Sequence, residues 1–333
     1  MVPPRAAIIG LSGPVLLPEE AALLRAARPL GVILFARNVR DPAQLSALTT
    51  AIREALGEAA PVLVDQEGGR VARLRPPHFA AFPAPGRFEG LPDAAARANA
   101  TLLGLECRAV GLDVVCGPVL DLRLPGRHSV VGDRGFAGDP EEVIRLGAAW
   151  IEGLQQAGAI PVIKHMPGHG RAMVDSHLEM PRVEVSRAEL AADLAPFRAL
   201  AGRGAWGMTA HIRFDAFDAE RPATLSPIVI REVIRGEIGF DGLLLSDDLA
   251  MKALHGTPAS LTAAVLAAGC DVALNCTGVL ADSQAALADC PPLSERALQR
   301  LADSQAATAA RWLPAPDRTA LAAARDAVLK DVA

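Results

Sequence analysis

Short apolar runs bounded by Gly or Pro recur along the chain, and longer stretches rich in Ala, Leu, Glu and Arg lie between them. The short runs have the length of buried strands, and the longer stretches have the periodicity of helices. Their alternation predicts a parallel sheet whose strands are joined by helices. Several of the longer stretches open with Asp, Ser or Pro, as helix N-termini do. The predicted strands are 6–10, 31–35, 61–65, 112–119, 159–165, 205–211, 242–247 and 270–275, and the predicted helices include 19–27, 42–56, 94–109, 140–157, 187–201 and 226–235.

Eight such β–α units in 333 residues predict a single-domain α/β protein, a (β/α)8 TIM barrel. We expect one catalytic domain over residues 1–333, with an Ala-rich helical tail from about residue 291. A doubly wound open sheet is the alternative. It lacks its main support, because no Gly-x-Gly-x-x-Gly motif follows the first predicted strand.

Composition narrows the classes of partner. Hydrophobic residues make up 51% of the chain, which is ample for a packed core. The net charge is −5 and no basic cluster occurs, which argues against nucleic acid as a partner. Nine Phe, three Trp and no Tyr leave few aromatic stacking surfaces, so aliphatic side chains must fill the core.

Nothing in the sequence predicts a membrane span or a targeting signal, and we expect a cytoplasmic protein that acts as a monomer. The five cysteines are odd in number and scattered, which is typical of small core residues in a reducing compartment. We expect neither a metal nor an organic cofactor.

Ionisable residues gather at the predicted strand ends. The active site of a barrel lies at the carboxyl ends of its strands, so five consecutive strands that end in acids or bases favour a catalytic mouth over separate helix caps. The residues at these five ends are Asp65 and Glu67, then Asp121, then Lys164 and His165, then His211, then Asp247 and Asp248.

The segment after the fifth predicted strand, residues 166–177, carries two glycines and could move as a lid. In an extended chain Asp175 and His177 project to the same side, so the carboxylate can orient the imidazole and tune its proton affinity. A metal site formed with His165 and His169 is a rival interpretation, but no tight ligand spacing supports it. Side chains that merely cap turns are a second rival.

Asp247 and Asp248 are neighbours, so their side chains should point to opposite sides of the seventh predicted strand. Asp248 precedes a segment that reads as a helix start, where a side-chain acceptor is expected. Asp247 closes the apolar strand and is therefore the better candidate for a nucleophile.

Several sequence blocks resemble glycoside hydrolase family 3, and specifically its single-domain bacterial β-N-acetylglucosaminidases. The likeness extends over nearly the whole chain, and the blocks follow the family's order. They are 164–170 (KHMPGHG) followed by 175–177 (DSH), together with 31–38, 64–71, 132–136, 239–242, 246–251 and 268–271.

The resemblance implies a retaining hydrolase that removes terminal β-linked N-acetylglucosamine from peptidoglycan turnover fragments, so a small carbohydrate or muropeptide is the expected partner. It implies Asp247 as the nucleophile and Asp175 with His177 as the acid/base dyad. It also implies that Asp65, Arg73, Arg134, Lys164 and His165 hold the sugar. Two departures leave the pocket wall and the first-strand rim less defined: Met166 replaces the usual Phe, and residues 10–13 lack the acidic residue often found there.

Other functions remain open at this stage. Another β-glycosidase of the family, or a phosphorylase, would use a similar barrel, although family β-glucosidases and β-xylosidases usually carry an added domain. Lys164 at a strand end could instead form a Schiff base in an aldolase-type barrel. A non-catalytic sugar-binding barrel is the remaining alternative.

Overall fold

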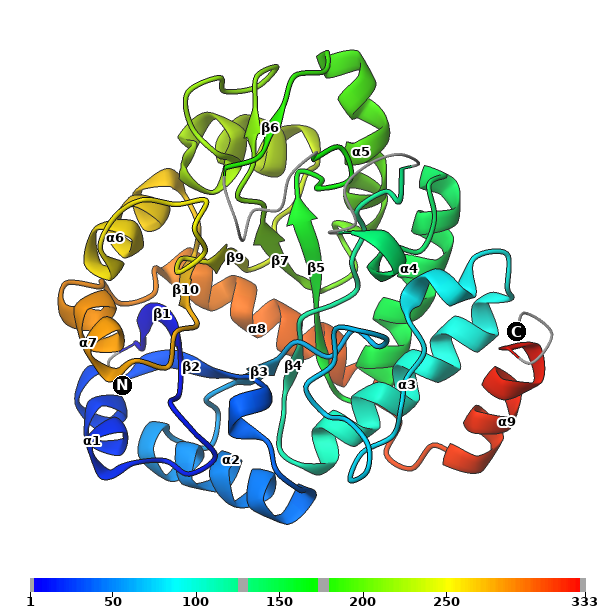
Figure 1. The fold of residues 1–333 in the computed structure, drawn as a ribbon, viewed down its shortest axis with the longest axis horizontal. Coiled ribbons are helices and arrows are strands. Elements are labelled where there is room, and N and C mark those ends of the chain that lie inside the picture. Colours follow the sequence, from blue (N-terminus) through cyan, green and yellow to red (C-terminus); the bar gives the residue numbers. More distant parts are fainter. Residues whose placement is uncertain (1–2, 125–130, 173–179, 330–333) are drawn as a thin grey trace.

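A computed structural model describes residues 3–124, 131–172 and 180–329 of the chain. Eight parallel strands close into a barrel in which each strand pairs with its two neighbours, and helices surround it (Figure 1). The (β/α)8 fold class predicted from the sequence is therefore confirmed. The barrel strands, in spatial order around the barrel, are β1 (Arg5–Gly10), β2 (Pro29–Leu34), β3 (Val62–Val64), β4 (Val114–Val115), β5 (Ile160–Met166), β7 (Trp206–Thr209), β9 (Leu244–Asp248) and β10 (Val272–Asn275).

The helices that connect these strands begin where the sequence places N-terminal signals. Proline occupies the first helical position in four of them, where its missing N–H costs no hydrogen bond. The Asp41 side chain caps one of these four by accepting a hydrogen bond from the Gln44 N–H. The helices are α1 (Pro18–Ala27), α2 (Pro42–Leu56), α3 (Asp93–Ala109), α4 (Pro140–Gln156), α5 (Arg187–Leu200), α6 (Pro258–Ala268), α7 (Leu280–Ala288), α8 (Glu295–Ala309) and α9 (Arg318–Leu329).

Shorter elements complete the fold. The predicted helix at 226–235 is wound as a π-helix, η5 (Val229–Glu237). Short helices of the 3₁₀ type are η1 (Ala36–Asn38), η2 (Pro85–Phe88), η3 (Gly132–Arg134) and η4 (Ala223–Leu225). A small parallel sheet that the sequence did not predict pairs β6 (Arg182–Val183) with β8 (Arg213–Phe214).

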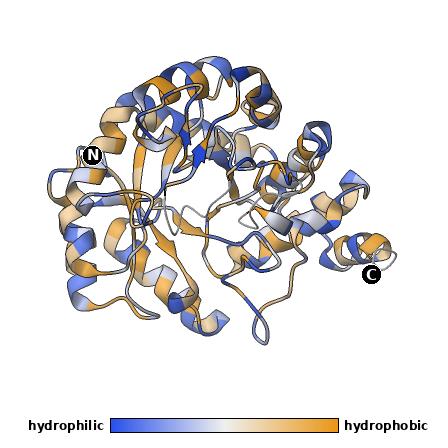
Figure 2. Ribbon diagram, turned by 45° about the horizontal axis from the view of Figure 1, so that its top comes forward, coloured by the Kyte–Doolittle hydropathy of each residue, from blue (hydrophilic) through white to orange (hydrophobic). Residues whose placement is uncertain are grey.

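Burial explains why the strands are continuously apolar. Helices cover the outside of the barrel (Figure 2). Every residue of β2 and of β5 is buried, as expected for strands packed on both faces. The predicted strand 112–119 is reduced to two paired residues. Pro118 lacks the N–H that a regular ladder needs, and pairing resumes at a bridge between Val119 and Lys164.

The C-terminal helices lie outside the eight β–α units. Helix α8 covers the N-terminal end of the barrel, where Trp206 Nε1 donates to Ser304 Oγ at 2.8 Å and Arg300 pairs with Asp271 at 2.8 Å (Figure 1). Helix α9 packs against α3. With one end of the barrel closed in this way, the opposite end, at the carboxyl ends of the strands, is left for a site. No helix in the described ranges is both long and apolar enough to cross a membrane.

Candidate active site

A cavity of about 240 Å³ opens at the carboxyl ends of the barrel strands. The structure brings Asp65, Arg73, Arg134, Lys164 and His165 to this one cavity, and Asp247 lines it as well. These residues come from five different parts of the chain and meet because parallel strands deliver their carboxyl ends to one rim. Asp175 and His177, the predicted dyad, lie outside the described residues.

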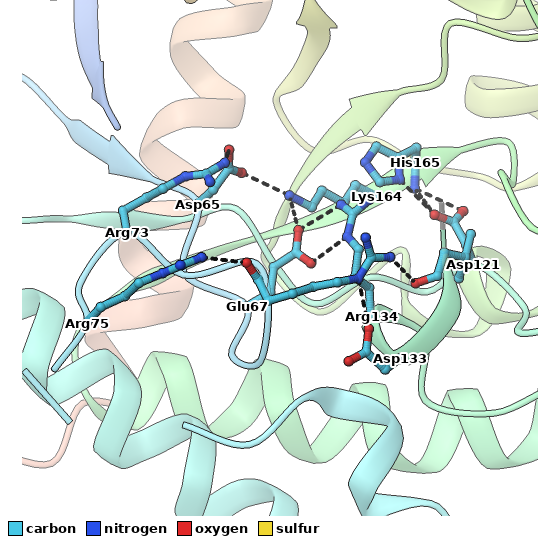
Figure 3. A network of polar contacts seen from close by, with 11 residues as sticks. Asp65, Glu67, Arg73, Arg75, Asp121, Asp133, Arg134, Lys164 and His165 are labelled. Atoms are coloured by element: carbon cyan, nitrogen blue, oxygen red, sulfur yellow. Dashed lines mark hydrogen bonds and ion pairs between the residues drawn. The ribbon is translucent and has the colours of Figure 1, made fainter. Parts of the chain in front are cut away.

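Oppositely charged side chains alternate along one wall of the cavity (Figure 3). Arg73 pairs with Asp65 at 3.0 Å, and Asp65 pairs with Lys164 at 3.0 Å. Lys164 also pairs with Glu67 at 2.7 Å, and Glu67 holds both Arg134 Nε and an Arg134 terminal nitrogen at 2.8 and 2.9 Å. Each charge in this array has an opposite charge in direct contact, which lets the array be buried.

The fixed charges keep both carboxyl groups ionised. Burial alone would raise the pKa of Asp65, but Lys164 and Arg73 outweigh it and hold the pKa well below its usual range. Burial also opposes ionisation of Glu67, and Arg134 and Lys164 lower its pKa to about 2. These carboxylates can therefore only accept hydrogen bonds at neutral pH.

Glu67 lies at a predicted strand end but is not among the residues that the sequence resemblance implies to hold the sugar. Its side chain is 1% exposed and joins the two cations Lys164 and Arg134. The alternation of side chains along an extended chain could have indicated this role, because residues 65 and 67 follow a strand and their side chains point to the same side. Gly68 and Gly69, with φ of +96° and +56°, then turn the chain sharply, so that the Val71 carbonyl accepts from the Glu67 N–H.

Gln66 faces away from these carboxylates and fixes the loop that carries Arg73. Its Oε1 accepts from the N–H groups of Arg73 and Leu74 at 2.8 and 3.1 Å, and its Nε2 donates to the Leu74 carbonyl. The Arg73 guanidinium also lies 5.4 Å from the Phe35 ring centroid, and that of Arg37 lies 4.8 Å from it. Phe35 is the one Phe, Tyr or Trp among the described residues that line the cavity, so hydroxyl-binding charges dominate the wall.

Asp247 and Asp248 both border the cavity, which corrects the expectation that only one of them would face it. The alternation of sides ends there because β9 stops at Asp248 and the chain turns. No helix begins at Asp248, another correction. Its carboxylate instead accepts from the N–H groups of Ala250 and Cys276, both at 3.0 Å.

The pKa values of the two neighbouring carboxyl groups are shifted in opposite directions. Burial raises the pKa of Asp248. Burial also opposes ionisation of Asp247, yet His211, His165 and the Asp248 N–H lower its pKa below the usual value. Asp247 is thus an ionised carboxylate at the cavity edge, whereas the Asp248 carboxyl group already accepts hydrogen bonds from two backbone N–H groups. This difference distinguishes the two acids more sharply than strand alternation does.

The remaining strand-end residues divide between the cavity and the surrounding structure. His165 and His169 line the cavity with ring centroids 5.6 Å apart, and His165 Nδ1 lies 2.7 Å from a carboxylate oxygen of Asp121. His211 is buried behind the wall, bonded to Thr224 Oγ1 and to the Asp248 carbonyl. No group of three or more His, Cys, Asp or Glu side chains that could hold a metal occurs in the described part of the chain.

Comparison with known proteins decides the family. Residues 17–303 match the glycosyl hydrolase family 3 N terminal domain. The chain belongs to this family. A β-hexosaminidase of Alkalilimnicola ehrlichii is 45% identical over 280 residues, covering 81% of this family 3 chain and 80% of that protein. A β-hexosaminidase of Pseudomonas aeruginosa is 42% identical over 299 residues, covering 88% and 86%.

Solved structures agree with the family 3 assignment. Native NagZ from Neisseria gonorrhoeae superposes with a TM-score of 0.87 at 31% identity, covering 100% of this chain and 99% of that one. A family 3 β-N-acetylglucosaminidase from Paenibacillus has a TM-score of 0.84 at 30% identity, covering 98% of this chain and 66% of that one. The barrel and its cavity are therefore those of a family 3 hydrolase.

Lys164 is poorly suited to the aldolase alternative. A lysine that forms a Schiff base must be deprotonated to the neutral amine before it can attack a carbonyl group. Burial favours the neutral form, but Asp65 and Glu67 outweigh it and raise the pKa of Lys164 above its ordinary value. In this family 3 chain Lys164 is a fixed ammonium that can only donate hydrogen bonds.

Proposed function

We propose that the protein is a retaining exo-β-N-acetylglucosaminidase that hydrolyses terminal β-linked N-acetylglucosamine from peptidoglycan turnover fragments in the cytoplasm. Its activity as a β-N-acetylhexosaminidase follows from family membership and from the β-hexosaminidases to which it is 42–45% identical. The finer assignment rests on the cavity: its size suits one sugar, and its walls offer charged hydrogen-bonding groups in place of aromatic platforms.

The observation that carries the mechanism is the ionised Asp247 carboxylate at the cavity edge. A carboxylate nucleophile must be unprotonated to attack an anomeric carbon. In the proposed first step Asp247 forms a bond to that carbon while the bond to the leaving oxygen breaks, which gives a covalent glycosyl-enzyme. Water then attacks the same carbon and releases Asp247, so the configuration is retained overall.

We assign the proton transfers to His177, oriented by Asp175. His177 gives a proton to the departing oxygen in the first step and takes one from water in the second, as microscopic reversibility requires. The support for this pair is the sequence block 175–177 and its position after the block 164–170. Residues 165 and 169 of the block 164–170 line the cavity.

The sugar itself would be held by the charged wall. Asp65 can accept from two neighbouring hydroxyl groups, while Arg73, Arg134 and Lys164 donate to oxygen acceptors. His165 supplies a further polar atom. All the proton and bond changes in the scheme are assigned to side chains of the protein, so it calls on no cofactor.

We expect His177→Ala to separate leaving groups. A substrate that departs as a natural sugar alkoxide needs a proton, so its kcat/KM should fall by about 10²- to 10⁴-fold. An activated aryl β-N-acetylglucosaminide departs without one and should lose far less in the glycosylation step. Steady-state rates on a matched pair of substrates measure the difference. The same rates measured with and without inorganic phosphate distinguish hydrolysis from phosphorolysis.

His78→Ala is the matched control for that variant, because His78 is an exposed histidine away from the cavity. Both substrates should react with it at the rate of the unaltered protein. Equal losses on the two substrates in His177→Ala would remove His177 from the acid/base role.

A further inference from the structure

Asp121 is a buried acid that the proposed mechanism does not use. It follows β4, its side chain is fully buried, and it lies behind His165 as seen from the cavity (Figure 3). Its carboxylate receives three groups: His165 Nδ1 at 2.7 Å, the His165 backbone N–H at 3.1 Å, and the His169 backbone N–H at 2.7 Å. The two backbone N–H groups can only donate hydrogen bonds.

These contacts determine where the His165 proton lies. Burial opposes ionisation of Asp121, but His165 and His169 lower its pKa, so the group is a carboxylate and can only accept. The imidazole nitrogen that faces it must therefore carry a hydrogen. We propose that Asp121 is a positioning residue that fixes His165 in the Nδ1–H tautomer and so presents the Nε2 lone pair to the sugar.

The consequence for binding rests on the proposed function. Lys164 and Arg134 at the same wall can only donate hydrogen bonds, and Asp65 and Glu67 already accept from these cations and from Arg73. A sugar hydroxyl has a hydrogen to donate as well as lone pairs. In the neutral ring, Nε2 of His165 faces no described protein partner, and the tautomer decides whether this atom accepts or donates a hydrogen bond.

Replacing Asp121 by Asn should reverse the tautomer. The amide oxygen has to stay with the backbone N–H groups of His165 and His169, because turning the amide would place its NH2 group against the His169 N–H. The amide NH2 then faces Nδ1, which must become the acceptor. The ring proton moves to Nε2, and the cavity loses its acceptor while gaining a donor.

Nitrogen NMR reads the tautomer without any substrate. In ¹⁵N-labelled protein, long-range ring correlations measured with His165 neutral should give an Nδ1–H pattern, assigned by the signals lost in His165→Gln. Asp121→Asn should give the Nε2–H pattern. Asp218→Asn changes another buried acid that accepts backbone hydrogen bonds and should leave the His165 signals unmoved. An Nε2–H pattern in the unaltered protein would overturn the proposal even if Asp121→Asn failed to fold.

Kinetics test whether Asp121 acts through His165. We expect Asp121→Asn to lower kcat/KM on an aryl β-N-acetylglucosaminide by about ten- to a hundredfold, mainly through a higher KM. In a His165→Gln background the same change should cost less than about twofold, because the ring it positions is gone. An equal loss in both backgrounds would make Asp121 a structural residue only. A reversed tautomer with unchanged kcat/KM would show that Nε2 does not bind substrate.

Discussion

Asp247→Ala should lower kcat/KM on β-N-acetylglucosaminides by about 10⁴-fold or more while leaving the fold intact. The substitution removes the carboxylate that we propose attacks the anomeric carbon, and loss of a nucleophile typically costs several powers of ten. Among the residues that the structure describes, Asp247 accepts one hydrogen bond, from the neighbouring Asp248 N–H, so little of the described structure depends on its side chain. Steady-state kinetics together with the melting temperature separate the loss of chemistry from any loss of stability.

Asp248→Asn is the matched control for Asp247→Ala. Both backbone N–H groups donate to the same oxygen of Asp248, Oδ1, so an amide oxygen in that place can still accept from both, and we expect a loss of about tenfold or less. A larger loss in Asp248→Asn than in Asp247→Ala would reverse the assignment of the nucleophile.

Glu67→Ala should destabilise the protein by about 3–5 kcal/mol, because it leaves Arg134 buried without its carboxylate and takes one of two carboxylates from Lys164. Glu67→Gln keeps the volume and one acceptor, so its effect on the free energy of unfolding should be smaller. Both variants should raise KM, since the cations that line the cavity lose the partner that orients them. Denaturant unfolding and substrate saturation curves measure the two effects.

The exposed ion pair between Glu89 and Arg123 provides the control for the Glu67 variants. Both side chains are one-third exposed or more, so Glu89→Ala should change stability by no more than about 1 kcal/mol. If Glu67→Ala is as mild as Glu89→Ala, the buried charge array does not hold the site together.

Low pH should weaken the ion pairs that Glu67 makes with Arg134 and Lys164. The pKa of Glu67 is lowered from 4.5 to about 2 in the folded protein, so near pH 3 the unfolded chain binds more protons at this position. The contribution of Glu67 to stability is therefore present above about pH 4.5 and is lost as the pH falls toward 2. In Glu67→Gln that part of the acid dependence should be missing.

The order of strands and helices could be predicted because burial on both faces leaves a strong mark on a sequence. The runs at 32–35 and 243–245 are apolar without interruption, and the structure places strands at both. Segments of irregular backbone have no comparable pattern in the sequence. The two-residue sheet of β6 and β8, the π-helix at Val229–Glu237 and the turn after Asp248 depend on contacts between distant segments.

The site could be predicted in part. Acids and bases at strand ends identify the rim, and Asp65, Lys164 and His165 lie there. A sequence does not say which of these groups contact each other, so the joining role of Glu67 and the placement of Asp121 behind His165 emerge only in three dimensions. Asp247 and Asp248 show the same limit, because hydrogen bonds from residue 276 distinguish them.

Covalent trapping tests the central claim most directly. A 2-deoxy-2-fluoro glycoside with a good leaving group should react rapidly once and then hydrolyse slowly, because fluorine disfavours the charge that develops in both steps. Intact-protein mass spectrometry should show the gain of one glycosyl unit, and peptide sequencing should place it on Asp247. A label on Asp248, or a burst of released leaving group with no gain in protein mass, would contradict the proposed mechanism.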